Sequence, residues 1–495
     1  MFPTLRLPKR FEALEQQATE NEYDLTAVVQ RIDSAAARVE ILLRQVDEGG
    51  LGRFELFLGK SGVGKTTFFK TLTKFFTGTS VLSVPNTIPL SDVPGYIEAR
   101  SSAHRGRQVW VMYDRDNETV SDQDAFTFSE QLRVLFRKTA GKVVVSWPLT
   151  DEKSARLLAK TAWEVGRDSI VDVSSKGLYE FQGPPKDTFI KIADLTTRSL
   201  KGDGLEAFGL DEETLNSLVA ESETIAEFYS RLEQKSSEIT GRYRDILKDK
   251  TIPSVWVLVA GDDSRALNLT VATLTQGVKK YVDVDRVTNY LDDPASDALY
   301  LSEWKKRRSQ VAFLMRLLDV RIFELPPNVA LACVREYDDD ELKSPLKLKK
   351  NSANLIDLME RTPFFRALLD EDSTHAAYSR KTEDETKHEF IRVQLQARTA
   401  DKKLNKALAS AVSDALLVNG VVAKLSAEKQ DSEGLKPDIR IEFENGRTVC
   451  LEPTWRSTGD AVPTEIPKRQ STLTVGHIQM YVLEKVLSYV DAMDL

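Results

Sequence analysis

A short glycine-rich stretch near the start of the chain could hold the phosphates of a nucleotide. Gly59, Gly64, Lys65 and Thr66 follow the spacing G-x-x-x-x-G-K-[ST] within the letters GKSGVGKTT. Glycines let successive backbone N–H groups turn toward a β-phosphate, Lys65 can reach the β- and γ-phosphates, and the Thr66 hydroxyl can ligate Mg²⁺. We call residues 59–67 the phosphate cradle. We expect all of it to contact the nucleotide: Gly59, Lys60, Ser61, Gly62, Val63, Gly64, Lys65, Thr66 and Thr67.

Acidic residues that could complete this site follow the apolar letters RQVWVMY. Asp114 comes first and is predicted to hold the Mg²⁺ water shell at the end of a neighbouring strand. A carboxylate that polarises the attacking water should lie close by, and Asp116 or Glu118 could serve. Many such ATPases place this acid directly after the first aspartate, where this chain has Arg115. The sequence therefore does not identify which residue is the hydrolytic base. The alternative is that Asp114 is only a polar residue at a strand end.

A second pair of acids lies in the letters LKPDIRIEFENGRTVCLEP near the C-terminus. Asp438 begins one predicted strand, Asn445 and Gly446 form a turn, and Glu452 lies near the end of the next strand. Hairpin geometry could bring the two carboxylates together around a divalent ion, which would activate water against a phosphodiester. The alternative is that Asp438 caps a turn and Glu452 is a surface partner of an arginine.

Short apolar strands alternate with helices from Arg53 to about residue 183. Strands are predicted at 53–59, 79–85, 107–114, 142–150 and 177–183, with helices between them. This alternation predicts an α/β fold with a mainly parallel sheet covered by helices on both faces. Ser146 and Thr150 could then sense a γ-phosphate from the fourth strand. Arg167 could reach a neighbouring subunit's nucleotide, although an ordinary surface arginine is the simpler interpretation.

The whole sequence divides into four predicted regions, with a linker before the last. Residues 1–50 are predicted to be helical, residues 51–200 to form the nucleotide-binding core, and residues 201–370 to be mainly helical with a strand at 254–261. The charged stretch 369–389 lacks apolar periodicity and is predicted to be a linker. Residues 385–495 show the order helix, three strands, helix, with the long helix at 403–418.

The order of elements after the cradle resembles the AAA+/STAND branch of P-loop ATPases over about residues 50–240. The sequence lacks the N-K-x-D motif that GTPases use to read the base, and it lacks the L-S-G-G-Q signature of transporter-type ATPases. The resemblance implies ATP and Mg²⁺ as cofactors, a helical lid beyond the sheet, and oligomers whose interfaces contain the nucleotide.

The C-terminal region resembles the PD-(D/E)xK nuclease superfamily over about residues 390–495. This resemblance implies a restriction-endonuclease-like α/β domain in which Asp438 and Glu452 are catalytic metal ligands. The family's lysine should stand two residues after the glutamate, where this chain has Thr454. Lys468 or Arg456 could replace it, and Gln479 resembles a glutamine of some branches. An active nuclease, a catalytically inactive binding module and an unrelated α/β domain all stay open.

Composition limits the remaining possibilities. The 495 residues are 41% hydrophobic and 29% charged, which is typical of a globular protein with two or three domains. A net charge of −8 argues against a basic coat over the whole surface, although the runs at 303–310 and 344–352 could form a local groove or a solvated face. Cys333 and Cys450 fit neither a disulfide framework nor a metal site. With no secretory signal and no membrane span, we expect a cytoplasmic protein.

Two functions compete. The first is a Mg²⁺-dependent ATPase joined to a nuclease-like effector that acts on DNA, as in bacterial antiviral defence systems, with self-association and a possible partner protein. The second is an ATP-driven signalling switch whose C-terminal domain only binds partners. A small-molecule kinase is a weaker third hypothesis, because such enzymes rarely need two further domains.

Overall fold

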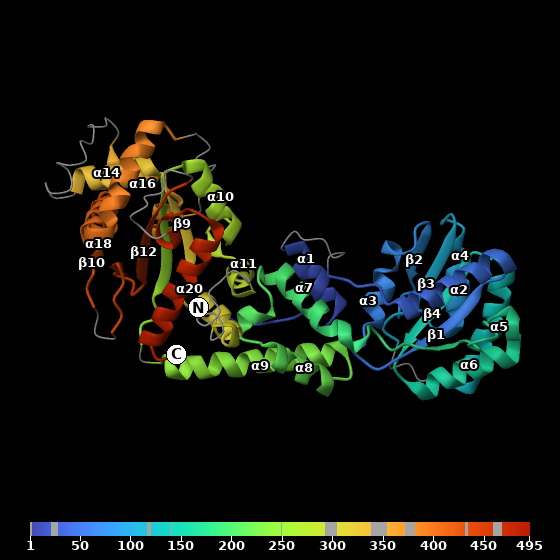
Figure 1. Ribbon diagram of the computed structural model, residues 1–495. Helices are drawn as coiled ribbons and strands as arrows, with labels where there is room; N and C mark the ends of the chain where they lie inside the picture. The colour runs from blue at the N-terminus through green and yellow to red at the C-terminus, as the bar shows by residue number, and fades with distance from the viewer. Residues whose placement is uncertain are drawn as a thin grey trace. The chain divides into compact units, whose positions relative to one another are not determined.

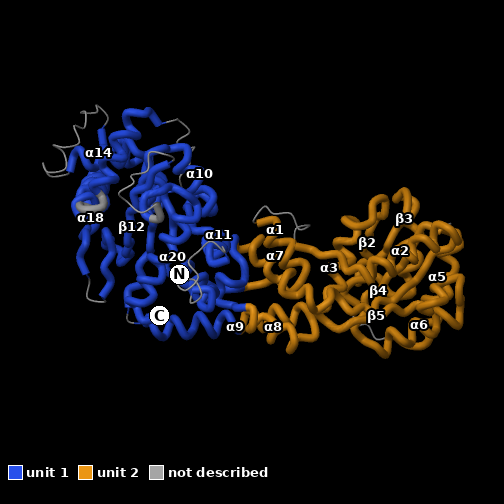
Figure 2. The backbone as a smooth tube through the Cα atoms, in the orientation of Figure 1, with its two compact units in different colours: residues 1–5, 202–211, 235–495 blue, residues 6–201, 212–234 orange. Residues whose placement is uncertain are grey.

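The computed structural model divides the chain into two compact units (Figures 1 and 2). Unit 1 contains residues 1–5, 202–211 and 235–495, and unit 2 contains residues 6–201 and 212–234. The structure describes residues 2–20, 28–115, 120–139, 141–248, 250–292, 304–337, 354–371, 382–430, 434–458 and 468–495. Residues 372–381 of the predicted linker at 369–389 lie outside the described part of the chain, whereas residues 384–389 belong to helix α18 (Asp384–Val418), so the linker is shorter than predicted.

Unit 2 is built on a five-stranded sheet in the order β2-β3-β4-β1-β5. All of its strand pairs are parallel. The strands are β1 (Arg53–Leu58), β2 (Thr79–Ser83), β3 (Arg107–Val111), β4 (Val143–Leu149) and β5 (Leu178–Glu180). The predicted α/β class and parallel sheet are therefore confirmed for this unit.

Helices cover both faces of this sheet, because alternate residues of its buried strands point to opposite sides. One face carries Phe54, Val145 and Trp147, which pack with α4 (Val93–Ser101), α5 (Asp122–Lys138) and α6 (Glu152–Gly166). The other face carries Phe57 and Val144, which pack with α2 (Asp33–Gly49) and α3 (Lys65–Lys70). The unit also contains α1 (Phe11–Glu20), α7 (Phe189–Lys201) and α8 (Glu212–Glu221).

Unit 1 is built on a seven-stranded mixed sheet in the order β10-β11-β12-β6-β9-β8-β7. β10 (Ala423–Ala427), β11 (Ile439–Phe443) and β12 (Thr448–Arg456) are the three strands predicted near the C-terminus, and they form an antiparallel meander. β12 then pairs in parallel with β6 (Ser254–Gly261), which pairs in parallel with β9 (Arg321–Leu325). The short strands β7 (Thr275–Gln276) and β8 (Tyr281–Val282) complete the edge.

These pairings differ from the expected layout of a helical middle region followed by a smaller separate domain. β6 and β9 come from the region predicted to be a helical middle domain, yet they extend the C-terminal sheet. Residues 235–495 therefore form one compact unit. The helix α9 (Ile225–Ile246) contains the boundary between the units at residues 234 and 235.

The two faces of the unit 1 sheet are packed differently. One face, including Leu451 and Trp256, lies against α14 (Pro327–Tyr337), α16 (Leu355–Glu360), α17 (Pro363–Leu368) and α18 (Asp384–Val418). α18 begins well before the predicted helix at 403–418. The terminal helix α20 (Val475–Ala492) contacts the opposite face through Glu452. The unit also contains α10 (Ser264–Leu274), α11 (Val284–Thr288), α13 (Arg308–Leu317) and α19 (Lys468–Ser471).

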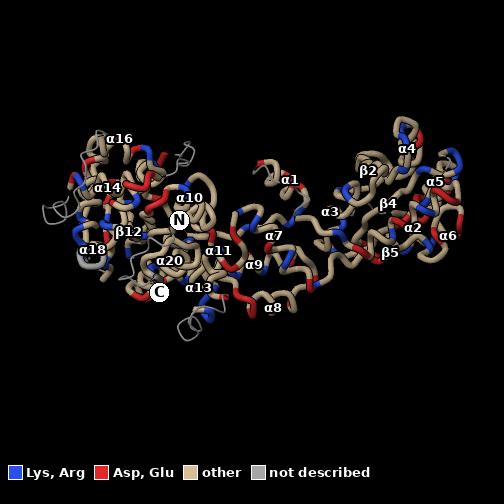
Figure 3. Tube along the Cα trace, turned by 45° about the horizontal axis from the view of Figure 1, so that its top comes forward, with Lys and Arg blue, Asp and Glu red and all other residues tan. Residues whose placement is uncertain are grey.

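Charged residues of both signs are interspersed along each unit (Figure 3). In the described part of the basic run at 303–310, Arg308 forms ion pairs with Glu206 and Asp292. The run at 344–352 lies outside the described residues. Both cysteines are buried, and neither forms a disulfide bond. None of the helices in the described ranges has the length and apolar character needed to cross a bilayer.

Candidate functional site

The phosphate cradle connects the end of β1 to the start of α3, as its motif predicts. Two of its glycines have left-handed backbone angles, with φ of 81° at Gly62 and 97° at Gly64, which other residues rarely adopt. Gly59 is required for another reason, since a Cβ atom there would lie 2.4 Å from the carbonyl oxygen of Phe181. The loop therefore depends on glycine at each of these three positions.

Aromatic packing fixes the helix that follows the cradle. Phe57 of β1 contacts Phe69 of α3 edge to face, with ring centroids 4.8 Å apart. Phe68 contacts Phe181, which follows β5, at 5.5 Å. These contacts hold α3 against two strands and so set the position of the residues at its start.

Lys65, the lysine of the motif, is bound to oxygen atoms of the loop itself. Its Nζ donates to the carbonyl oxygens of Gly59 at 2.5 Å and Lys60 at 3.1 Å. It also donates to the hydroxyl of Thr150 at 3.1 Å, directly after β4. Thr150 is therefore placed at the cradle, as expected for a residue that could sense a γ-phosphate.

The other two residues considered around the nucleotide lie elsewhere. Ser146 is fully buried inside β4, level with Glu55 of β1 and Val111 of β3, and not at the strand end. Arg167 is exposed, with a φ of 46°, directly after α6. This position after α6 fits a surface arginine as well as an intersubunit one.

Asp114 lies after β3, which is separated from β1 by β4. It is exposed and has a φ of 55°, so the chain turns sharply at the carboxyl end of the strand. Arg115, the next residue, is buried and donates to the carbonyl oxygens of Pro85 at 2.8 Å and Ile88 at 2.5 Å. Arg115 therefore holds the loop after β2 in place, which gives the arginine at this position a structural role. Asp116 and Glu118 lie outside the described residues.

The start of α9 packs on the apex of the cradle within unit 2. The backbone N–H of Ala226 donates to the Gly62 carbonyl at 3.3 Å, and a Cβ at Gly62 would lie 2.7 Å from the Ala226 Cβ. Lys60 also forms an ion pair with Glu223. A helical segment thus covers the cradle.

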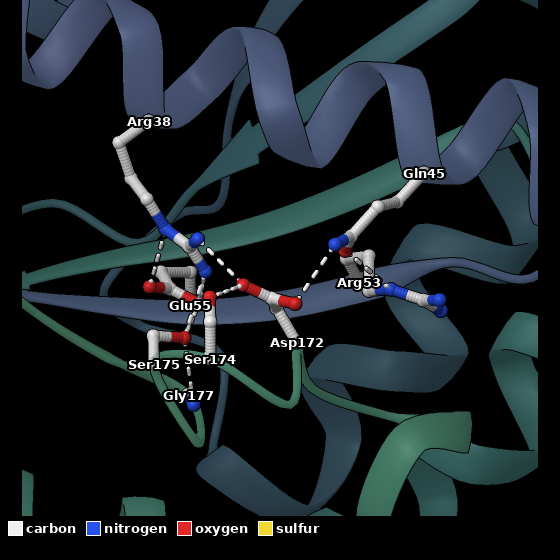
Figure 4. A network of polar contacts seen from close by, with 8 residues as sticks. All are labelled: Arg38, Gln45, Arg53, Glu55, Asp172, Ser174, Ser175 and Gly177. Carbon is white, nitrogen blue, oxygen red and sulfur yellow. Dashed lines mark hydrogen bonds and ion pairs between the residues drawn. The ribbon is translucent and has the colours of Figure 1, made fainter.

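A buried ionic network lies beside β1, away from the cradle (Figure 4). Arg38 of α2 donates to Glu55 at 2.9 Å and to Asp172 at 2.6 Å. Asp172 also accepts from Gln45 at 2.8 Å and from Ser174. Burial acts to raise the pKa of Asp172, but the hydrogen bonds from Ser174, Gln45 and Arg38 outweigh it and hold that pKa well below its usual range.

This network borders a cavity of about 290 Å³ at the amino end of β1. Because the cradle follows the carboxyl end of the same strand, the cavity is separate from the nucleotide site. We interpret the network as structural, since its charged groups satisfy one another. The cavity is lined by Gln45, Glu48, Gly49, Arg53, Asp168, Val171, Asp172 and Val173.

The second candidate site lies in unit 1, where the structure brings Asp438 and Glu452 together around a lysine. Asp438 directly precedes β11, and Glu452 lies inside β12 with only 1% of its surface exposed. Lys485 of α20 forms an ion pair with Glu452, and its Nζ lies 3.2 Å from Asp438 Oδ2. The hairpin therefore places the two acids within reach of a single cation.

α20 presents three polar groups to β12 at a spacing of four residues, which is one helical turn. The Tyr481 hydroxyl donates to the Pro453 carbonyl at 3.1 Å. One turn later is Lys485, and one turn after that the Tyr489 hydroxyl donates to Glu452 Oε1 at 2.5 Å. The sequence-based prediction did not include these three residues. Their i, i+4, i+8 spacing, on a helix otherwise rich in buried residues, was the available signal.

The basic residue that pairs with the two acids is Lys485, whereas the sequence suggested Arg456 or Lys468 as a replacement for the missing lysine. Arg456 is buried, donates to the Thr454 hydroxyl at 2.7 Å, and lies over the Tyr481 ring at 5.5 Å. Burial lowers the pKa of Arg456 to about 10. Lys468 begins α19, and its side chain is outside the described set. Gln479 donates to the Arg286 carbonyl of α11 at 2.6 Å.

The electrostatics of this site follow from burying two acids and one base together. Burial, and then the neighbouring Glu452 carboxylate, raises the pKa of Asp438 above its usual range. Burial opposes the charged form of Lys485, but Tyr481, Glu452 and Asp438 outweigh it and raise the lysine pKa. Among the described residues, no cluster of three or more His, Cys, Asp or Glu side chains could hold a metal ion. A metal at this pair would therefore rely on two carboxylates and on water or substrate oxygens.

Comparisons with known proteins identify no family. No protein-family model matches the sequence, and a search of the curated proteins finds no match. A solved structure of a DNA replication initiation factor is similar at 13% identity and a TM-score of 0.26, covering 79% of this chain and 96% of that chain. A similarity at this level carries no inference about this protein, so function is argued from the sites.

Proposed function

We propose that the protein is a Mg²⁺-dependent ATPase of the AAA+/STAND type whose nucleotide site controls a nuclease-like unit acting on DNA. The observation that carries the ATPase proposal is the geometry around Lys65. The cradle follows the first strand of a parallel sheet, and Lys65 and Thr150 meet at the carboxyl ends of two adjacent strands. Thr66 and Asp114 would hold the Mg²⁺, which would neutralise charge on the phosphates. The strand order and the helical cover over Gly62 fit the proposed type.

Replacing Lys65 by alanine should abolish tight ATP binding and lower the ATPase rate by about 100-fold or more, because a cation aimed at the phosphates is lost. Nucleotide titration and phosphate release measure the two effects. Lys70→Ala is the matched control, since Lys70 lies on the same helix but binds Glu12 at 2.6 Å. Asp114→Ala should retain part of the nucleotide binding and lose Mg²⁺-dependent turnover. An ATPase rate that Lys65→Ala leaves unchanged contradicts the assignment of the phosphate cradle as the nucleotide site.

The nuclease part of the proposal is supported by the meeting of Asp438, Glu452 and a lysine. This lysine is Lys485, which lies on helix α20 and not on β12, the strand that carries Glu452. It supplies the basic residue that the nuclease proposal expects beside the two acids. The donor set suits a divalent ion, because both acids already share one cationic group. Asp438 and Glu452 would hold the ion, which supplies an activated water. Once the ion has taken the place of its ammonium group, Lys485 would turn from the acids to meet the charge of a phosphodiester.

One observation favours the second candidate, an ATP-driven switch whose C-terminal unit only binds partners. Lys485 balances part of the charge of the two acids, and such an ion pair can hold a fold together without any metal. Metal-dependent DNA cleavage separates the two candidates. Action on DNA and a role in defence belong to the first candidate. Self-association, a possible partner protein and a cytoplasmic location are proposed for both.

A further inference from the structure

We propose that Lys485 is a built-in competitor of the divalent cation at the Asp438–Glu452 pair, so that the metal affinity of this site is set by displacement of a lysine. The inference rests on the proposed metal-dependent function and names what regulates its site. It concerns equilibrium binding of a cation, and it is tested without DNA.

The contacts place the ammonium group where a shared metal ion would bind. Lys485 Nζ forms an ion pair with Glu452 and lies 3.2 Å from Asp438 Oδ2. A divalent ion bound by both acids needs oxygen atoms of the same two carboxylates. The ammonium group and the metal ion therefore compete for one place, because two cations so close repel each other strongly away from bulk water.

The orientation of Glu452 adds to this competition. Tyr489 donates to Glu452 Oε1, so this oxygen is already engaged by α20. The other oxygen, Oε2, is the one paired with Lys485. A metal ion that takes Glu452 through its remaining oxygen must therefore displace the lysine.

The site is open enough for this exchange. About a quarter of the Lys485 side chain (25%) and a fifth of Asp438 (22%) are exposed, whereas Glu452 is 1% exposed. A hydrated ion can thus approach from the side of Asp438 and Lys485. The Tyr481 ring, with its centroid 5.6 Å from Lys485 Nζ, lies beside the ammonium group.

Lys485→Gln tests the proposal by calorimetric titration of the full-length protein with Mn²⁺ and with Mg²⁺. We expect the variant to bind one ion about tenfold or more tightly than the wild type, since a competing charge is removed. Adding Asp438→Asn to Lys485→Gln should abolish the gain. Lys485→Met is a second variant of similar length, and thermal unfolding verifies that each variant is folded.

Lys280→Gln is the matched control. Lys280 lies 3.4 Å from Glu324, a buried glutamate of the same sheet, with side-chain exposures of 16% and 4%. This variant should bind no additional ion, since the described ion pair of Lys280 involves a single carboxylate, that of Glu324. If folded Lys485→Gln and Lys485→Met bind Mn²⁺ no more tightly than the wild type, the competition proposal is wrong. A gain that survives Asp438→Asn, or an equal gain in Lys280→Gln, also overturns it.

The outcomes are distinguishable from those of the nuclease proposal. A gain in metal affinity in a protein that never cleaves DNA supports the competition and contradicts the nuclease. Metal-dependent cleavage by the wild type, with no gain in Lys485→Gln, supports the nuclease and contradicts the competition.

Discussion

Lys65 and Lys485 are both held by oxygen atoms of the chain itself, but these oxygens differ in charge. Lys65 binds two backbone carbonyls and a threonine hydroxyl, which are neutral. Lys485 binds two carboxylates. Hydrogen bonds to neutral oxygens are readily exchanged for a phosphate, whereas an ion pair with a buried and a partly buried carboxylate is exchanged only for another cation. The same residue type thus suits a nucleotide site in one place and a cation-controlled site in the other.

Asp172 gives a prediction for single residues because three side chains stabilise its charged form. Asp172→Asn should lower the stability of unit 2 by about 2 kcal/mol at neutral pH, since Arg38 loses one of its two carboxylate partners. The pKa of Asp172 is lowered in the folded state. Its contribution is therefore complete above the unfolded value of about 4 and is lost as the pH falls through the folded pKa.

Denaturant unfolding of wild type and Asp172→Asn between pH 7 and pH 3 measures this effect. The difference between the two proteins should stay constant down to about pH 5 and narrow below about pH 4. Asp168→Asn, at an exposed position in the same region, should change stability by less than about 0.5 kcal/mol. A difference that widens on acidification contradicts the role given to Asp172.

Residues that depend on local pattern could be predicted, whereas those that depend on distant contacts could not. The spacing of Gly59, Gly64 and Lys65 defines the cradle within a few residues, and Thr150 follows from the end of a strand. Lys485 lies 33 positions beyond Glu452 on a helix, so local spacing does not link the two. Only the packing of α20 against β12 brings them together.

At the scale of elements, the cradle depends on the close approach of β1, β5 and α9. The Phe181 carbonyl lies directly against Gly59, and Ala226 lies against Gly62. The loop is therefore enclosed on two sides, by a backbone carbonyl at Gly59 and by a side-chain methyl group at Gly62, which leaves little room for a side chain at either glycine.

Gly59→Ala should cost roughly 1–3 kcal/mol of stability and weaken nucleotide binding, because the new Cβ would press on a backbone carbonyl that cannot rotate away. Thermal unfolding with and without ATP and Mg²⁺ measures both effects. Gly95→Ala is the control, since a Cβ there meets no atom within 4 Å and alanine favours helix α4. Equal nucleotide-induced stabilisation in the wild type and Gly59→Ala argues against this view of the loop.

The strands of unit 2 could be read from the sequence because each is a short apolar run next to a helix in a repeated β–α order. In unit 1 the strands β10, β11 and β12 could be predicted in the same way. The pairing of β12 with β6 could not be predicted, since it joins Glu452 to Val257 across almost 200 residues of chain. Parallel pairing over such a distance leaves no local turn signal.

At the scale of the whole molecule, each compact unit carries one candidate site. The cradle lies in unit 2, and the Asp438–Glu452 pair lies in unit 1. α9 belongs to both units, and its first turn contacts the cradle at Gly62. If nucleotide state controls the acid pair, a change at the cradle in unit 2 must alter the site in unit 1.

The most direct measurement of the central claim is Mg²⁺-dependent DNA cleavage, with and without ATP, by the wild type, Lys65→Ala, Asp438→Asn and Glu452→Gln. We predict that the wild type cleaves DNA in a nucleotide-dependent manner and that Lys65→Ala loses this dependence. Asp438→Asn and Glu452→Gln should lose cleavage while they keep the ATPase rate of the wild type. Cleavage unchanged in both acid variants, or no cleavage by the wild type in any nucleotide state, contradicts the proposed nuclease and leaves the ATP-driven switch.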